Sequence, residues 1–361
     1  MVIGRIAPGA METCVFELPA PILLYQLASP LKFVVAEQDR NERFAPDGPT
    51  LSWALAGQRL GAPPGEKGQW VHFGFRDGLS EVSIDEALPA AADRRRHLPG
   101  SLLLGHVNDA GFNEFALTRA PEKVRRFFRD SSFGVFRKIQ QEVKAFEAQV
   151  DRWAVQMAQA IPGLQQPRDF VKAKLCGRWP DGRQLLRGEL VPNPHGSLAL
   201  KLDDDKAGEG CPFGSHVRRM RAAPDSDGNL FDRPLQRRGV PFGPAAWSQP
   251  PDDAAECGLL GQFFCASLED QFEHLLSQWA ARPPLGLAAM DRALDPFGGS
   301  RQDADAALAV PLKDRPTQLL RGFSAWTTAK GTMYAWHPGR LGLFALLDND
   351  FVPEKDERPW L

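Results

Sequence analysis

The feature that most constrains this chain is a long stretch, residues 180–251, which is crowded with proline and glycine and shows no helical or strand periodicity. A structureless segment of that length is uncommon in a compact domain unless it carries a function. The whole chain has 361 residues, enough to bury a core around a cofactor. We therefore expect this stretch to bind a buried cofactor.

The segments on either side show regular patterns. Apolar residues recur at intervals of three and four over residues 121–160 and 268–279, which predicts helices. Short strand-like runs lie at 102–104, 258–264 and 332–336, with proline, glycine and aspartate in the connections. Short strands mixed with a few helices predict an α+β fold rather than a doubly wound sheet. No repeat of fixed short period is present, which argues against solenoids and propellers.

Composition and charge exclude several classes of protein. The net charge of −2 gives no general attraction to nucleic acid or acidic membranes. No apolar run reaches the ~18 residues needed to span a bilayer, and the N-terminus is a poor secretory signal. The five cysteines are scattered without a CxxC pair, which argues against a disulfide framework or structural zinc site. We expect a cytoplasmic protein without nucleic-acid or membrane partners.

Two segments contain residue types suited to chemistry. In GFRDG, residues 74–78, two glycines bracket Asp77 in a tight turn that would present its carboxylate, although a surface turn is the commoner meaning of so short a pattern. In CPFGSHVRR, residues 211–219, His216 follows a Pro/Gly turn and precedes two arginines. A neutral imidazole is the usual proximal haem ligand, and arginine binds carboxylates such as haem propionates. A loop histidine in a basic patch is the alternative, while a zinc site would need further ligands.

Taken in order, these segments resemble the dye-decolourising peroxidase family. GFRDG matches the family's GxxDG motif, CPFGSHVRR matches its proximal-histidine segment, and RRGVPFG (237–243) matches the segment that carries the distal arginine. The resemblance runs from about residue 70 to about residue 345. Weaker similarities lie at residues 99–105, 132–138, 174–182, 295–298 and 331–336.

The resemblance implies a fold of two tandem ferredoxin-like α+β modules. We expect an N-terminal module over residues 1–160 and a haem-binding module over residues 161–361. GFRDG lies earlier than in the family pattern, and residues 1–70 have no recognisable counterpart there. The first module is therefore expected to be shortened, remodelled or completed by another chain, as in a homo-oligomer, because an open sheet edge is usually covered.

The resemblance also implies a haem-dependent peroxidase. Its cofactor would be haem b, with His216 as the ligand to the iron, and its substrates would be hydrogen peroxide and an organic reductant, dye-like or phenolic, oxidised in one-electron steps. By motif position, Asp77 would shuttle a proton and Arg237 would hold the developing negative charge. The alternative is a haem-binding or haem-free module that serves assembly without turnover, against which the retained Asp77, Arg237 and His216 argue.

Further residues are assigned by the same resemblance. Arg219 is expected to bind a haem propionate. Asp295 is expected to accept a hydrogen bond from the second nitrogen of His216, with Glu269 as the rival acid.

Four residues of two late strands complete the predicted surroundings of the cofactor. Gln262 stands where the family pattern has an apolar distal residue, and Phe264, two positions further on, keeps that apolar character. Tyr334 and Trp336 are candidates to relay electrons from bulky substrates, although buried aromatic strand residues are the commoner explanation.

Overall fold

The computed structural model describes thirteen segments of the chain, and the statements below concern these residues. They are 2–7, 10–15, 57–58, 60, 62–79, 82–84, 96–113, 122–202, 204–220, 233–245, 256–282, 294–298 and 306–347.

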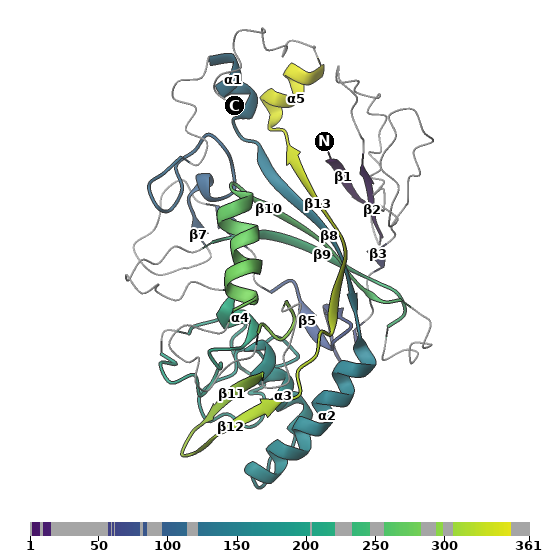
Figure 1. Cartoon of the computed structure of the whole chain (residues 1–361), viewed down its shortest axis with the longest axis vertical. Coiled ribbons are helices and arrows are strands. Elements are labelled where there is room, and N and C mark those ends of the chain that lie inside the picture. Colours follow the sequence, from purple (N-terminus) through teal and green to yellow (C-terminus); the bar gives the residue numbers. More distant parts are fainter. Residues whose placement is uncertain are drawn as a thin grey trace.

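A four-stranded antiparallel sheet forms the centre of the molecule (Figure 1). Its strands lie in the order β13 (Thr327–His337), β8 (Ser132–Gln141), β10 (Gly258–Cys265) and β9 (Gln236–Phe242). β8 therefore pairs on both sides with strands from much later in the chain. The predicted boundary between two modules, at residue 160, falls between β8 and its partners, so this sheet combines segments from both sides of it.

The helix predicted over residues 121–160 is wrong in its middle. The chain forms α1 (Glu122–Phe128), then β8, then α2 (Val143–Ala160). Asp130 has a φ of 61°, a conformation that ends a helix. The aromatic and β-branched residues that follow favour a strand, and pairing with β10 and β13 overrides the helical spacing of the apolar residues.

Of the other predicted elements, two strands and one helix are confirmed and one strand is not. The run 258–264 is confirmed as β10, and 332–336 lies within β13. The helix over 268–279 is confirmed as two consecutive helical pieces with π-type turns, η2 (Leu268–Glu273) and η3 (Leu275–Ala280). The strand predicted at 102–104 is wrong, because this segment follows a short helical turn, η1 (Pro99–Ser101), and Leu102 and Leu104 are buried without strand pairing.

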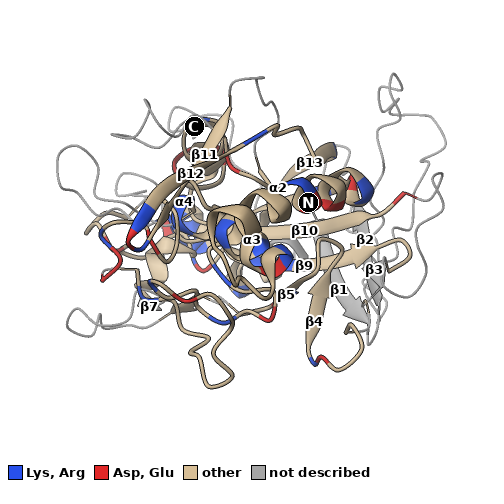
Figure 2. Ribbon diagram, turned by 90° about the horizontal axis from the view of Figure 1, so that it is seen from below, with Lys and Arg blue, Asp and Glu red and all other residues tan. Residues whose placement is uncertain are grey.

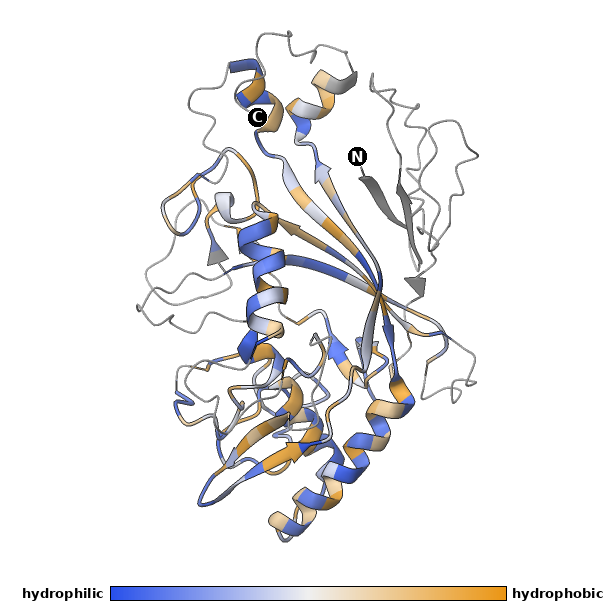
Figure 3. Ribbon diagram, in the orientation of Figure 1, coloured by the Kyte–Doolittle hydropathy of each residue, from blue (hydrophilic) through white to orange (hydrophobic). Residues whose placement is uncertain are grey.

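The main hydrophobic core lies below the central sheet in the view of Figure 1. One side of α2 is buried there, with Phe146 and Trp153 in ring contact with Trp326. Figure 3 shows the apolar residues of the hairpin β11 (Ala307–Leu312) and β12 (Arg315–Arg321), which also belong to this core. The helix α3 (Pro167–Cys176) packs beside α2 and closes the core.

The N-terminal region contributes a separate small sheet. β1 (Val2–Ala7) and β2 (Ala10–Val15) form an antiparallel hairpin, and β2 also pairs with β3 (Gly57–Gln58). A further short parallel pair joins β6 (Ser83–Ile84) to β7 (Arg96–His97). Most of residues 16–70 before the GFRDG motif lie outside the described residues, so the predicted remodelling of the first module and its completion by another chain stay predictions.

Antiparallel sheets mixed with helices confirm the predicted α+β class. A last helix, α5 (Arg340–Leu347), lies beside α1 beyond one end of the sheet. Figure 2 shows basic and acidic residues interspersed along the ribbon. None of the helices in the described part of the chain is long and apolar enough to cross a membrane.

Candidate active site

One face of the central sheet carries Arg237, and we call it the Arg237 face. Antiparallel pairing places Arg237 of β9 directly opposite Phe263 of β10, and Gly239 opposite Gly261. Side chains of directly paired residues lie on the same face, and every second residue of a strand shares it. The helical pieces η2 and η3 cover part of this face, where the rings of Phe263 and Phe272 lie 5.3 Å apart.

The GFRDG motif forms a tight hairpin next to this face. Strands β4 (Gln69–Val71) and β5 (Phe75–Asp77) pair antiparallel, and Gly74 takes a φ of +75° in the turn between them. A carboxylate oxygen of Asp77 lies 3.9 Å from the position that a Cβ on Gly239 would occupy. Asp77 is therefore placed over Gly239, two residues along β9 from Arg237, and both side chains are exposed.

His72 connects this hairpin to β9 by a hydrogen bond. The sequence analysis did not identify this residue. Its Nε2 donates a hydrogen bond to the backbone carbonyl of Phe242 at 2.7 Å, and the residue is only 1% exposed. Burial lowers the pKa of His72, despite the opposing effect of that carbonyl, so the neutral ring is favoured. The signal available in the sequence was a lone histidine next to the aromatic residues of the motif.

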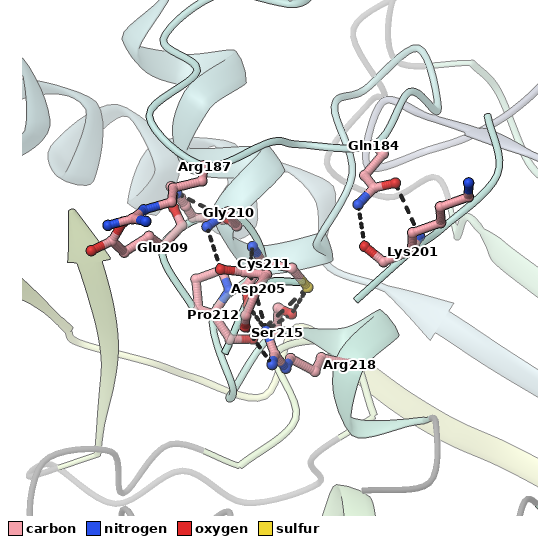
Figure 4. A network of polar contacts seen from close by, with 11 residues as sticks. Gln184, Arg187, Lys201, Asp205, Glu209, Gly210, Cys211, Pro212, Ser215 and Arg218 are labelled. Atoms are coloured by element: carbon pink, nitrogen blue, oxygen red, sulfur yellow. Dashed lines mark hydrogen bonds and ion pairs between the residues drawn. The ribbon is translucent and has the colours of Figure 1, made fainter. Parts of the chain in front are cut away.

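On the other side of the site, a rigid loop leads into the short helix α4 (His216–Arg219), as Figure 4 shows. The carboxylate of Asp205 accepts a hydrogen bond from the backbone N–H of Cys211 at 2.7 Å and one from Arg218 at 3.1 Å. Ser215 donates to the carbonyl of Pro212 at 2.7 Å. These bonds fix the Pro/Gly turn, and thereby the start of α4, at which His216 stands.

His216 is paired with Asp295. Its Nδ1 lies 2.9 Å and 3.0 Å from the two carboxylate oxygens of Asp295, which is fully buried. Burial would raise the pKa of Asp295, but the interaction with His216, the N–H of Gly298 and the charge of Arg219 outweigh it and lower that pKa. An ionised Asp295 accepts the Nδ1 proton, which leaves Nε2 of His216 as the unprotonated nitrogen.

Phe297 connects the His216 side of the site to the Asp77 side. Its ring lies 5.4 Å from the ring of His216 and 5.5 Å from that of Phe75 in β5. Phe75 stands two residues before Asp77 on the same strand. The structure thus brings His216, Asp295, Asp77 and Arg237 into one region.

Arg219, expected to bind a haem propionate, donates its hydrogen bonds to backbone carbonyls in this structure. Its Nε donates to the carbonyl of Gly214 at 3.0 Å, and its Nη1 donates to the carbonyls of Trp279 and Arg282 at 2.9 and 2.6 Å. This buried guanidinium ties α4 to the C-terminal end of η3. Glu269, the rival acid for His216, is exposed at the start of η2, whereas Asp295 makes the contact.

The structure does not bring Gln262 and Phe264 to the Arg237 face. Gln262 is paired with Arg238, so both project from the opposite face, and the ring of Phe264 contacts that of His337 there at 4.9 Å. The expectation that these two residues line the cofactor stays a prediction, whereas the register shows that they do not share a face with Arg237, because successive residues of a strand alternate between faces. The register assigns Phe263 and Gly261 to the Arg237 face instead.

The two candidate relay residues differ in their surroundings. Tyr334 is 48% exposed, and its ring lies 6.3 Å from Phe272, which in turn contacts Phe263. Trp336 stacks on Phe127 of α1 with ring centroids 4.9 Å apart. The packing explanation therefore fits Trp336, while Tyr334 lies at the edge of the Arg237 face.

The donors of this site fit haem better than a metal held by several side chains. Within the described segments, no group of three or more His, Cys, Asp or Glu residues is placed to hold a metal ion. A single imidazole backed by a buried carboxylate is the ligand arrangement of a haem iron. Gly239 and Gly261 add no side chains of their own to the Arg237 face, where the Asp77 carboxylate lies over Gly239 and the ring of Phe263 lies over Gly261. The residues present thus suit a flat cofactor with one protein ligand.

Comparisons with known proteins agree with this arrangement. Over 251 residues, 63% of this chain and 50% of the relative, the chain is 31% identical to the multifunctional dye peroxidase DyP2 of Amycolatopsis sp.. It is 29% identical over 236 residues, 60% of this chain and 44% of the relative, to the dye-decolorizing peroxidase msp1 of Mycetinis scorodonius. No family model matches the chain. The resemblance to dye-decolourising peroxidases that the motifs predict is confirmed.

Solved structures show the fold. An ancestral D-type dye-decolorizing peroxidase superposes with a TM-score of 0.62 at 23% identity, covering 82% of this chain and 66% of that one. DyP2 from Amycolatopsis sp. gives a TM-score of 0.60 at 22% identity, covering 82% of this chain and 65% of that one. The predicted dye-decolourising-peroxidase fold is therefore confirmed. The chain spans about half the length of the curated relatives it matches, 44% to 50% of the first three.

Proposed function

We propose that this chain is a haem-dependent peroxidase that reduces hydrogen peroxide and oxidises organic reductants, dye-like or phenolic, in one-electron steps. The observation that carries the proposal is the pairing of His216 with the buried Asp295 in the same region as Asp77 and Arg237. The similarity to named dye-decolourising peroxidases supports it. Haem b would supply the redox-active iron at which peroxide is cleaved.

On the proximal side, the protein holds one nitrogen ready for the iron. The carboxylate of Asp295 accepts a hydrogen bond from the Nδ1–H of His216. This bond selects the tautomer with an unprotonated Nε2 and raises the basicity of the ring. The backbone N–H groups of Phe297 and Gly298 donate to the same carboxylate at 2.9 and 2.5 Å and hold it in place. His216 would be the metal ligand, with Asp295 as its positioning residue.

On the distal side, two exposed side chains would act on the peroxide. The Asp77 carboxylate can take a proton from one peroxide oxygen and return it to the other, so that the second leaves as water. The Arg237 guanidinium is charged at every working pH and can stabilise the negative charge that develops on the departing oxygen. Their common placement beside Gly239 supports this division of work.

We also propose a reducing, cytoplasmic location. Cys176, Cys211, Cys257 and Cys265 are free thiols. Burial raises the pKa of Cys176 and of Cys265 to about 12, which keeps them unreactive. Free buried thiols are typical of proteins kept in reducing compartments.

The direct test is peroxide-dependent oxidation of an anthraquinone dye and of a phenol by the full chain produced with haem supply. We expect turnover that requires both haem and peroxide and that saturates with peroxide. Bound haem without turnover would favour the assembly module instead. Size measurement on the same sample tests whether the chain forms a homo-oligomer, as predicted for residues 1–70.

A further inference from the structure

Arg137 of β8 lies on the Arg237 face and was not predicted to take part in the site. It is paired with Gly261 of β10, which is itself paired with Gly239 of β9. The three residues therefore form one row across the sheet, and the two glycines in it have no side chains. Neighbouring strands are about 4.8 Å apart, so Arg137 stands roughly 10 Å from β9, which carries Arg237.

One of the donor groups of the Arg137 guanidinium is left without a hydrogen-bond partner. Its Nε is buried and finds no hydrogen-bond acceptor among the described residues. Burial also lowers the pKa of Arg137, an effect that nearby Tyr334 partly opposes. A buried donor of a charged group costs free energy when its bond is left unmade. The unmade bond therefore points to a ligand that brings its own acceptor.

Two buried arginines of this region do have acceptors. Arg178 donates to the carbonyls of Gly182 and Leu198 at 2.8 and 2.6 Å, and Arg219 donates to three carbonyls. Arg219 thus has little left to offer a propionate. Arg137, in contrast, lies on the Arg237 face of the sheet and has a buried Nε–H without an acceptor.

We propose that Arg137 binds a propionate carboxylate of the bound porphyrin, the task that the sequence analysis gave to Arg219. This inference rests on the proposed function, because it takes haem as the cofactor. A carboxylate is the acceptor that matches a guanidinium in charge and shape. Beside Arg137, the ring of Phe263 lies over Gly261 and supplies an apolar surface on the Arg237 face.

The test compares two ligands that differ only in the free carboxylates. The full chain, freed of haem, is titrated with iron protoporphyrin IX and with its dimethyl ester, and binding is followed by quenching of tryptophan fluorescence. The variants are Arg137→Gln and the conservative Arg137→Lys. Arg238→Gln is the matched control, because Arg238 lies in the same sheet, on β9, but on the opposite face.

We expect Arg137→Gln to weaken binding of the free acid about tenfold or more, as for loss of a charge-assisted bond, and to leave the ester unchanged. Arg137→Lys should retain part of the preference for the free acid, and Arg238→Gln should retain all of it. Equal weakening of both ligands would show a merely structural role and overturn the inference, as would an unchanged preference. If the wild-type chain binds neither ligand, the proposed function itself fails.

Discussion

The two sides of the candidate site are built in opposite ways. On the proximal side, His216 and Asp295 are held by a dense set of hydrogen bonds, and Asp295 has no exposed surface. On the distal side, Asp77 and Arg237 are exposed side chains, positioned by a hairpin and by strand register. The difference matches the two proposed tasks: a permanent ligand would need a fixed geometry, whereas groups that act on an incoming peroxide would have to stay accessible.

This contrast predicts that proximal changes act on stability and haem retention, while distal changes act on rate. Replacing Asp295 with Asn should have the largest effect, because it removes a buried charge and leaves the Nδ1–H of His216 badly paired. Loss of a hydrogen bond to a charged group costs about 1.5–3 kcal/mol. Urea unfolding and haem content after gel filtration measure both consequences, and wild-type stability with full haem content would break the comparison.

The same pair predicts a pH dependence with a definite sign. The folded pKa of Asp295 is lowered, so its stabilisation is complete above the ordinary carboxyl pKa of about 4 and is lost as pH falls through the lower folded value. The stability gap between wild type and Asp295→Asn should therefore be constant at neutral pH and shrink in acid. A gap that widens in acid would contradict the ionised state of Asp295.

Arg237→Leu should slow the reaction with peroxide by ~10²–10³-fold, the usual loss of one preorganised charge-stabilising donor. Asp77→Asn should slow it less, because ordered water can partly replace a proton shuttle but not a fixed charge. Since both side chains are exposed, unfolding free energies should stay within about 0.5 kcal/mol of wild type.

Stopped-flow absorbance of haem-loaded variants across neutral pH gives this ranking. A slower Asp77→Asn enzyme would reverse the order of the two residues. Unchanged rates in both variants would remove them from the site.

His72 links stability to the distal side and should give an intermediate effect. His72→Ala removes the hydrogen bond to Phe242 and should cost about 1–3 kcal/mol. Because the hairpin also carries Asp77, the variant should slow the peroxide reaction in the wild type but not in Asp77→Asn. A rate loss of equal size in both backgrounds, measured by a double-mutant cycle, would show that His72 does not act through Asp77.

The smallest effect is expected on the opposite face of the sheet. Gln262→Ala should leave the rate of reaction with peroxide unchanged within about twofold, because Gln262 projects away from Arg237. Stopped-flow measurement beside the wild type is sufficient. A rate loss comparable to that of Arg237→Leu would mean that the register of β9 and β10 differs from the one described.

Sequence reasoning located the segments of the site better than the side chains within them. The motifs identified His216, Asp77 and Arg237 because each residue belongs to a turn or strand with a recognisable sequence pattern. Asp295, far along the chain, was placed through the resemblance, and the structure brings it to His216. Gln262 and Phe264 were assigned without the strand register, and register decides which face a residue occupies.

Other features depend on partners distant in the sequence and could not be read from it. The apolar spacing of residues 121–160 is compatible with a helix throughout, and only pairing with β10 and β13 makes its middle a strand. Arg219 stands in a basic motif that suggests anion binding, but the carbonyls at the end of η3 occupy it. The Nε of Arg137 and the ring of His72 are buried by residues distant in the sequence, so no local pattern identifies either residue as important.

The central claim is that Nε2 of His216 is the protein ligand to a haem iron. The most direct measurement is the absorption spectrum of the full chain and of His216→Ala, both produced with haem supply, before and after addition of imidazole. We predict a Soret band in the wild type, its loss or strong weakening in His216→Ala, and partial recovery with imidazole. Full haem occupancy with an unchanged spectrum in His216→Ala would contradict the account.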